Sequence, residues 1–181
     1  MTSISDFIPN YPLITDDMFN YNLVRKKEFY ELRSGHDQSC INDELYWNHQ
    51  KVVQRFLSPF TPYMELLLFG KPGTGKTCAS IAVSEMNKID PLLRKPILII
   101  VPNDTLVSQW KNEIALRCTT GEYIPENYFS TDPLERLTNL EKVIRMGKLL
   151  APVYYITTIE KMKRNIDALS DDAIRKRYSN T

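Results

Sequence analysis

The sequence of 181 residues predicts an α/β fold with a mainly parallel sheet flanked by helices. Three apolar runs, at 64–69, 96–101 and 153–157, are typical of strands, and patterns with helical spacing separate them. The second run is almost continuously apolar, which predicts a parallel strand buried on both faces. Strands that alternate with helices along the chain favour parallel pairing, and this order predicts the fold class.

Two regions are expected. Residues 1–41 predict a partly helical N-terminal extension, in which Asp16 and Asp17 cap a helix that runs to about Arg33. Residues 42–181 predict the main domain. Its first helix begins at 42–44, ends before Pro59 and leads into the first strand.

Further helices follow the strands of the main domain. Asp104 is predicted to cap one helix, and Asp132-Pro133 forms a start signal for another. Four such helices are expected. The first follows the first strand and ends at about Lys88, and the second runs from Thr105 to about Cys118. The third runs from Asp132 and ends at Gly147, and the fourth begins at about Ile159.

The composition limits the classes of protein that fit the chain. Hydrophobic residues make up 43% of the sequence, which supports a packed core, and the formal net charge is only +1. Any nucleic-acid contact is therefore expected to be local rather than due to a global basic field. No apolar run approaches the roughly 20 residues of a membrane span, and no signal-peptide layout is present at the start. We expect a soluble chain with no membrane partner.

Cysteine usage indicates the compartment. Cys40, Cys78 and Cys118 are widely spaced, odd in number and contain no Cys-x-x-Cys pair. This pattern predicts reduced thiols in an intracellular, reducing compartment, and it argues against a zinc site.

A glycine-rich segment after the first apolar run carries the strongest signal for function. It fits the pattern G-x-x-x-x-G-K-T between a strand and a helix, which is typical of a loop that binds the phosphates of ATP or another nucleoside triphosphate. Lys76 is predicted to reach the β and γ phosphates as the catalytic lysine, and the hydroxyl of Thr77 is predicted to hold Mg²⁺. The predicted nucleotide-binding residues of the loop are Gly70, Lys71, Pro72, Gly73, Thr74, Gly75, Lys76 and Thr77.

A glutamine precedes this loop by twenty residues. Gln50 follows His49 at the end of Leu45-Tyr46-Trp47-Asn48, and a glutamine amide can donate and accept hydrogen bonds together, as the edge of adenine requires. This position resembles that of the upstream glutamine motif by which superfamily 2 helicases read adenine. The resemblance implies that Gln50 contacts adenine, and we interpret His49 as its packing or capping neighbour.

The second strand runs into a further motif, Val101-Pro102-Asn103-Asp104-Thr105-Leu106-Val107-Ser108-Gln109-Trp110. This segment resembles motif Ia of superfamily 2 helicases and translocases. Gln50 and the phosphate-binding loop precede it in the order that this superfamily has. The resemblance covers roughly residues 45–181 and implies the first RecA-like domain of such an enzyme, with ATP and Mg²⁺ as cofactors and nucleic acid, DNA rather than RNA, as partner. It also implies nucleic-acid contacts at Pro102, Asn103, Gln109, Thr157 and Thr158.

Within that superfamily the arrangement is similar to the helicase-like early transcription factors and nucleoside triphosphatases of large DNA viruses, of the poxvirus type. This resemblance implies a viral, transcription-linked protein in the host cytoplasm, within a viral factory, or in the virion. It also implies possible contact with the transcription machinery. The resemblance lies in the order of motifs from Val101 through the segment at 122–129.

One expected feature is missing from the sequence. Superfamily 2 enzymes carry a D-E-x-H or D-E-x-D box that completes the Mg²⁺ site and activates the attacking water. The chain has no such box, so we expect an incomplete RecA-like sheet and a chain that binds ATP weakly and hydrolyses it negligibly. Two alternatives stay open, an ATPase of the AAA+ class and a non-catalytic module whose interactions depend on nucleotide.

Overall fold

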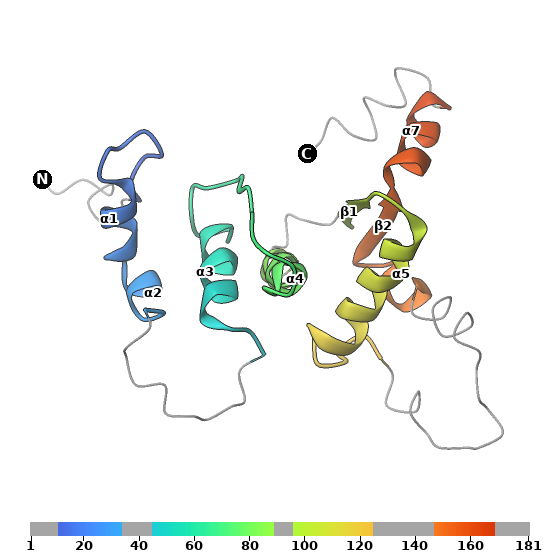
Figure 1. The fold of residues 1–181 in the computed structure, drawn as a ribbon, viewed down its shortest axis with the longest axis horizontal. Coiled ribbons are helices and arrows are strands. Elements are labelled where there is room, and N and C mark those ends of the chain that lie inside the picture. Colours follow the sequence, from blue (N-terminus) through green and yellow to red (C-terminus); the bar gives the residue numbers. More distant parts are fainter. Residues whose placement is uncertain (1–10, 34–44, 89–95, 125–146, 169–181) are drawn as a thin grey trace, which may run out of the picture. The chain divides into compact units, whose positions relative to one another are not determined.

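The chain forms two compact units, residues 1–90 and 91–181. Each unit is described by itself. The computed structural model describes four stretches of the chain, 11–33, 45–88, 96–124 and 147–168 (Figure 1). A mixture of helices and a small parallel sheet is present, which agrees with the predicted α/β class. The boundary expected after residue 41 falls outside the described stretches and stays a prediction.

The described part of the first unit is helical. Its helices are α1 (Phe19–Val24), α2 (Lys27–Tyr30), α3 (Asn48–Phe56) and α4 (Lys76–Asn87). The single helix expected from Asp16 to Arg33 is wrong, because Lys26 has an extended backbone with ψ 138° and separates α1 from α2. The break lets Leu23 of α1 and Phe29 of α2 reach the same core.

Aromatic side chains build this core. Tyr63 is buried and stacks on Phe56, with ring centroids 4.4 Å apart and an interplanar angle of 7°. Its hydroxyl donates a hydrogen bond of 2.8 Å to the carbonyl oxygen of Pro12. The core consists of Leu23, Phe29 and Tyr63, with Tyr11, Phe19 and Phe56 packed against them. The N-terminal helices are thereby packed onto the end of α3, since stacked and edge-on aromatic rings favour a fixed geometry.

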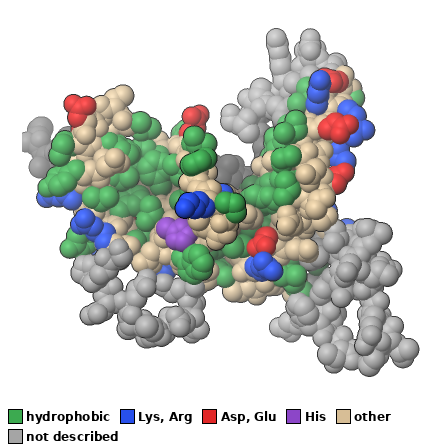
Figure 2. Space-filling model, viewed as in Figure 1, with side chains coloured by type: hydrophobic (Ala, Val, Ile, Leu, Met, Phe, Trp, Pro, Cys, Tyr) green, Lys and Arg blue, Asp and Glu red, His purple; other side chains and the backbone are tan. Residues whose placement is uncertain are grey.

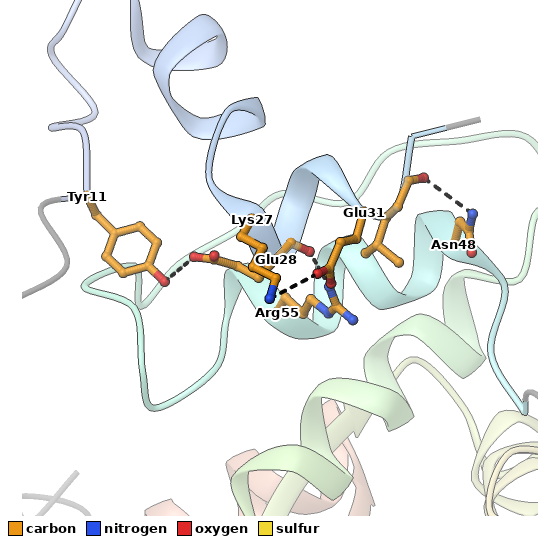
Figure 3. A network of polar contacts seen from close by, with 7 residues as sticks. Tyr11, Lys27, Glu28, Glu31, Asn48 and Arg55 are labelled. Carbon is orange, nitrogen blue, oxygen red and sulfur yellow. Dashed lines mark hydrogen bonds and ion pairs between the residues drawn. The ribbon is translucent and has the colours of Figure 1, made fainter. Parts of the chain in front are cut away.

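A polar network adjoins the core and joins Tyr11, α2 and α3 (Figure 3). The hydroxyl of Tyr11 donates to the carboxylate of Glu28 at 2.5 Å. Arg55 of α3 donates to the backbone carbonyl of Glu28 and lies 3.7 Å from the carboxylate of Glu31. One guanidinium therefore holds two groups of the N-terminal segment, which suits its several donors.

Burial and the hydrogen bond to Glu28 raise the pKa of Tyr11 to about 12. The folded state therefore favours the neutral phenol, and this contribution is fully present below the ordinary pKa of about 10 and is lost as the pH rises towards 12. We expect the free energy of unfolding to fall between pH 10 and 12, and to fall less steeply in the variant Tyr11→Phe. Urea unfolding followed by circular dichroism at these pH values measures both slopes, and identical slopes would contradict the role of Tyr11.

Helix α4 begins at the glycine-rich loop and packs against α3. The predicted end near Lys88 is confirmed, and Ile81 and Ala82 are buried. Gln54 of α3 donates 3.1 Å to the carbonyl oxygen of Ala82, which fixes the spacing of the two helices. None of the helices in the described stretches is long and apolar enough to cross a membrane.

The strand predicted at 64–69 is wrong. These residues have no strand assignment, and Met64, Leu67 and Phe69 are 92%, 90% and 94% exposed. The apolar pattern is that of a buried strand, but no strand occurs in the described part of the first unit to pair with it. Hydrophobic side chains accordingly lie on the molecular surface, as Figure 2 shows.

The second unit contains the parallel sheet. Strand β1 (Ile97–Val101) pairs with β2 (Tyr154–Thr158), and Val101 lies opposite Thr158 at the last position of the register. The described part of the unit contains α5 (Asp104–Asn112), the π-helix η2 (Glu113–Arg117) and α7 (Ile159–Asp167), besides the helical residues 147–150. Each strand leads directly into a helix.

One expectation for the sheet is wrong, and another is confirmed with a small shift. The interpretation of β1 as buried on both faces is wrong, because Ile99 and Val101 are buried whereas Leu98 and Ile100 are 42% and 47% exposed. A continuous apolar run does not distinguish a strand with one buried face from a strand with two, because Leu, Ile and Val occur in both. The strand predicted at 153–157 is confirmed with a shift of one residue.

The helices of this unit also differ in detail from the prediction. Asn103, not Asp104, caps α5, because the Asn103 side chain accepts a hydrogen bond of 3.0 Å from the backbone N–H of Leu106. Gly147 is the first of four described helical residues, 147–150, and does not end a helix. The rest of the helix predicted from Asp132 lies outside the described residues.

Candidate nucleotide-binding site

The glycine-rich loop turns into α4 through glycines with left-handed backbones. Gly73 and Gly75 have φ values of 81° and 74°, which other residues adopt only with strain. Gly75 is the N-cap of α4, and no side chain caps this helix among the described residues. The first backbone N–H groups of α4 therefore lack a side-chain acceptor, and together with the helix dipole they form a site suited to an anion.

Lys76, the first residue of α4, folds back over the loop. Its ammonium donates to the carbonyl oxygens of Gly70 and Lys71 at 2.9 and 2.6 Å and lies 3.5 Å from the hydroxyl of Thr74. The hydroxyl of Thr74 in turn donates 2.9 Å to the carbonyl oxygen of Lys71. A positive charge is thus held in the middle of the loop, where the predicted phosphates would lie.

The residues of the loop fit the nucleotide and the metal ion that the sequence implies. Thr77 is the second residue of α4 and is half-buried, so its hydroxyl is an oxygen donor of the kind that Mg²⁺ prefers. Pro72 and Gly73 are exposed at the tip of the loop. The donor set comprises backbone N–H groups, one ammonium and one hydroxyl, and it suits a phosphate chain with its cation.

Helix α3 brings Gln50 to the loop. The Gln50 side chain is 5% exposed, donates 3.1 Å to the carbonyl oxygen of Gly75 and accepts 2.8 Å from the backbone N–H of Trp47. Gln50 therefore lies beside the loop, and both its amide nitrogen and its amide oxygen are hydrogen-bonded. Each amide atom keeps one further hydrogen-bonding position, because the oxygen has two lone pairs and the nitrogen two hydrogens.

His49 is a contact of the loop that sequence reasoning did not find. Its Nε2 atom lies 3.1 Å from the carbonyl oxygen of Thr74, and its ring lies against the ring of Trp47 with centroids 5.5 Å apart. Its position beside Gln50 at the start of a helix was the available signal, but a lone histidine carries no indication of its partner.

The residues expected to contact nucleic acid gather at one edge of the β1–β2 sheet in the second unit. The two strands are parallel, so Pro102 and Asn103 after β1 lie at the same edge as Thr157 and Thr158 at the end of β2. Helices α5 and α7 both begin at this edge, and Lys161 lies 2.5 Å from the carboxylate of Asp104 across it. The edge therefore presents two helix N-termini side by side.

The side chains at this edge are already engaged in the fold. The Thr158 hydroxyl caps α7 by accepting 3.2 Å from the backbone N–H of Lys161, and Asn103 caps α5 in the same way. Thr157 and Thr158 are buried, whereas Pro102 and Asn103 are exposed. Gln109 lies further along α5 and is exposed. A ligand at this edge would thus meet backbone groups and exposed side chains before it met the two threonines.

Comparison with known proteins shows relatives in large DNA viruses. No family model and no solved structure matches the sequence. The chain is 37% identical over 140 residues to the protein named putative helicase 009L of Frog virus 3 (isolate Goorha), covering 77% of this chain and 14% of the relative. It is 29% identical over 191 aligned residues to putative helicase 087L of Invertebrate iridescent virus 3, covering 99% of this chain and 18% of the relative.

A third relative comes from a different virus group. The protein named putative ATP-dependent RNA helicase L377 of Acanthamoeba polyphaga mimivirus is 28% identical over 130 residues, which cover 62% of this chain and 11% of the relative. The chain thus spans less than a fifth of the length of each of these three relatives. The similarity supports a relationship to the helicase superfamilies. The matching segment is a short part of each relative, and each relative is named a putative helicase of a large DNA virus.

Proposed function

We propose that the chain is the ATP-binding N-terminal part of a superfamily 2 DNA helicase or translocase of a large DNA virus. The observation that carries the proposal is the loop from Gly70 to Thr77, in which a left-handed Gly75 caps α4 and the Lys76 ammonium lies over the loop. The helicase names of the viral relatives support it independently.

The proposed roles in ATP binding follow from the donors of the loop. Backbone N–H groups at the start of α4 would bind the phosphates, Lys76 would move its ammonium from the carbonyls of Gly70 and Lys71 to the β and γ phosphates, and Thr77 would ligate Mg²⁺. Gln50 would read adenine through the donor and acceptor positions that its bonds to Trp47 and Gly75 leave open.

The proposed nucleic-acid contact lies at the sheet edge of the second unit. The N-termini of α5 and α7 would bind the phosphate backbone, and exposed Pro102, Asn103 and Gln109 would flank it. The caps at Asn103 and Thr158 orient the first turns of these helices. Because one relative is named an RNA helicase, binding assays should include both DNA and RNA.

The viral context is part of the same proposal. The relatives from iridoviruses and a mimivirus suggest a protein of a large DNA virus, acting in an intracellular, reducing compartment such as the host cytoplasm or carried in the virion. A link to transcription rests on the resemblance of the motifs alone, and co-purification with viral RNA polymerase from infected cells would test it.

The direct test is calorimetric titration of the 181-residue chain with ATP, with and without Mg²⁺. We expect Mg²⁺-dependent binding and no hydrolysis above background, with or without DNA, because the sequence supplies no D-E-x-H box to activate water. Absence of ATP binding by the folded chain would contradict the proposed function. Robust hydrolysis that requires Lys76 would contradict the view that this part holds ATP without using it.

Replacement of Gln50 separates the proposal from the AAA+ alternative. In the variant Gln50→Leu, loss of preference for ATP over GTP would support adenine reading, whereas an unchanged preference would favour the alternative. Comparison with Gln54→Leu controls for packing, because Gln54 bonds the carbonyl of Ala82 on the body of α4.

A further inference from the structure

Three consecutive residues at the start of α3 each direct a side-chain nitrogen at a backbone carbonyl of another segment. The first of them, Asn48, is shown with its partner in Figure 3. The other two reach neighbouring carbonyls of the phosphate-binding loop. The contacts join Asn48 to Leu32 at 3.3 Å, His49 to Thr74 at 3.1 Å and Gln50 to Gly75 at 3.1 Å.

The contact of His49 has a defined chemical requirement. A carbonyl oxygen only accepts hydrogen bonds, so the Nε2 atom must carry a hydrogen to bond Thr74. The neighbouring Trp47 ring, tilted by 55° and with its centroid 5.5 Å away, restricts the imidazole on one side. The geometry therefore selects the Nε2–H form of the neutral ring.

The carbonyl of Thr74 determines where the next amide points. In a trans peptide, the C=O of one residue and the N–H of the next lie in one plane and point in opposite directions. A Thr74 carbonyl held towards His49 on α3 therefore turns the N–H of Gly75 away from α3. Gly75 itself has φ 74°, a left-handed conformation that glycine adopts without steric strain.

Helix α3 can serve as a fixed reference for this restraint. Asn48 ties its first turn to the carbonyl of Leu32, and Arg55 near its end bonds the carbonyl of Glu28. His49 thus extends from a helix that is held near both ends, and the residue is itself exposed to solvent.

We propose that His49 is a positioning residue that orients the Thr74–Gly75 peptide of the phosphate-binding loop through its Nε2–H group. The consequence for ATP binding rests on the proposed function, whereas the orientation of the peptide does not. His49 makes no contact with a reacting group in this arrangement and acts through the loop backbone.

The test compares two substitutions of His49. His49→Phe keeps a ring beside Trp47 and removes the donor, whereas His49→Gln places an amide nitrogen near the former Nε2 position. Gln54→Leu is the matched control, because it removes a side-chain bond from α3 to the Ala82 carbonyl and leaves the loop contacts intact. ¹⁵N NMR on the nucleotide-free chain reports the ring form of His49 above pH 8 and the heteronuclear NOE of the Thr74 and Gly75 amides.

We expect the Nε2–H form in the wild type, a lower NOE at Thr74 and Gly75 in His49→Phe, and wild-type values in His49→Gln and Gln54→Leu. ATP affinity should fall about fivefold in His49→Phe and stay within about twofold in His49→Gln, as the loss of one hydrogen bond implies. An Nδ1–H ring, or loop amides in His49→Phe that match the wild type, would overturn the inference. Failure of the wild type to bind ATP would instead count against the proposed function, because the NMR comparison decides the inference without nucleotide.

Discussion

The variant Lys76→Ala should bind MgATP roughly 10- to 100-fold more weakly than the wild type. The ammonium already donates to two loop carbonyls, at 2.9 and 2.6 Å, so it lies where it can transfer these donors to a phosphate chain. Hydrogen bonds to charged groups contribute about 1.5–3 kcal/mol, which corresponds to this range of affinity. Calorimetric titration of ATP into both proteins at one ionic strength measures the ratio.

Lys71 provides the matched control for charge. It belongs to the same loop, its side chain is exposed, and only its backbone carbonyl bonds Lys76 and Thr74. Lys71→Ala removes the same charge and should weaken binding by no more than about threefold, since exposed charges are screened by salt. Equal losses in both variants would show that Lys76 contributes only its charge. That result would contradict the proposed contact with the phosphates.

Local signals account for the parts of the fold that sequence reasoning predicted correctly. The G-K-T sequence after Gly73 predicted the start of α4, and the apolar runs at 96–101 and 153–157 predicted both strands of the sheet. These elements are specified by residues within one turn or one strand. The cap of α7 at Thr158, which the structure shows, is equally local, because it depends on a hydrogen bond three residues along the chain.

Features of the fold that depend on residues distant in the chain could not be predicted from local sequence patterns. The run at 64–69 has the composition of a buried strand, yet a strand exists only where a neighbouring strand supplies hydrogen bonds. The break between α1 and α2 follows from the need of Leu23 and Phe29 to share a core with Tyr63, which lies more than thirty residues later in the chain. No local pattern contains that information.

The candidate site shows the same division. The sequence identified Gln50 by its distance from the loop, and the structure adds the loop carbonyl that its amide contacts, at Gly75. His49 went unrecognised as a loop contact because its partner, Thr74, is twenty-five residues away and offers only a backbone atom. Side-chain bonds to backbone carbonyls leave no trace in the identity of the accepting residue.

The variant Gly75→Ala should lower the stability of the chain and weaken its binding of ATP. Gly75 has φ 74°, which disfavours an alanine by about 1–2 kcal/mol. An added Cβ would also lie 2.5 Å from the Nε2 atom of Gln50, so the buried amide must move and lose its hydrogen bond, which is worth about 0.5–1.5 kcal/mol. We expect the free energy of unfolding to fall by about 2–3 kcal/mol, measured by urea unfolding.

Gly73→Ala separates the two causes, because Gly73 has a similar φ of 81° but no atom within 4 Å of an added Cβ. It should show only the backbone strain, about 1–2 kcal/mol. A second comparison removes the opposing atom, because in the double variant Gly75→Ala with Gln50→Ala the clash is absent. If the clash is real, the loss in the double variant should be smaller than the sum of the two single losses, since neighbouring substitutions are not additive. Equal losses for Gly73→Ala and Gly75→Ala would instead mean that α3 does not restrain the loop at Gly75, so the glycine would be required for its conformation alone.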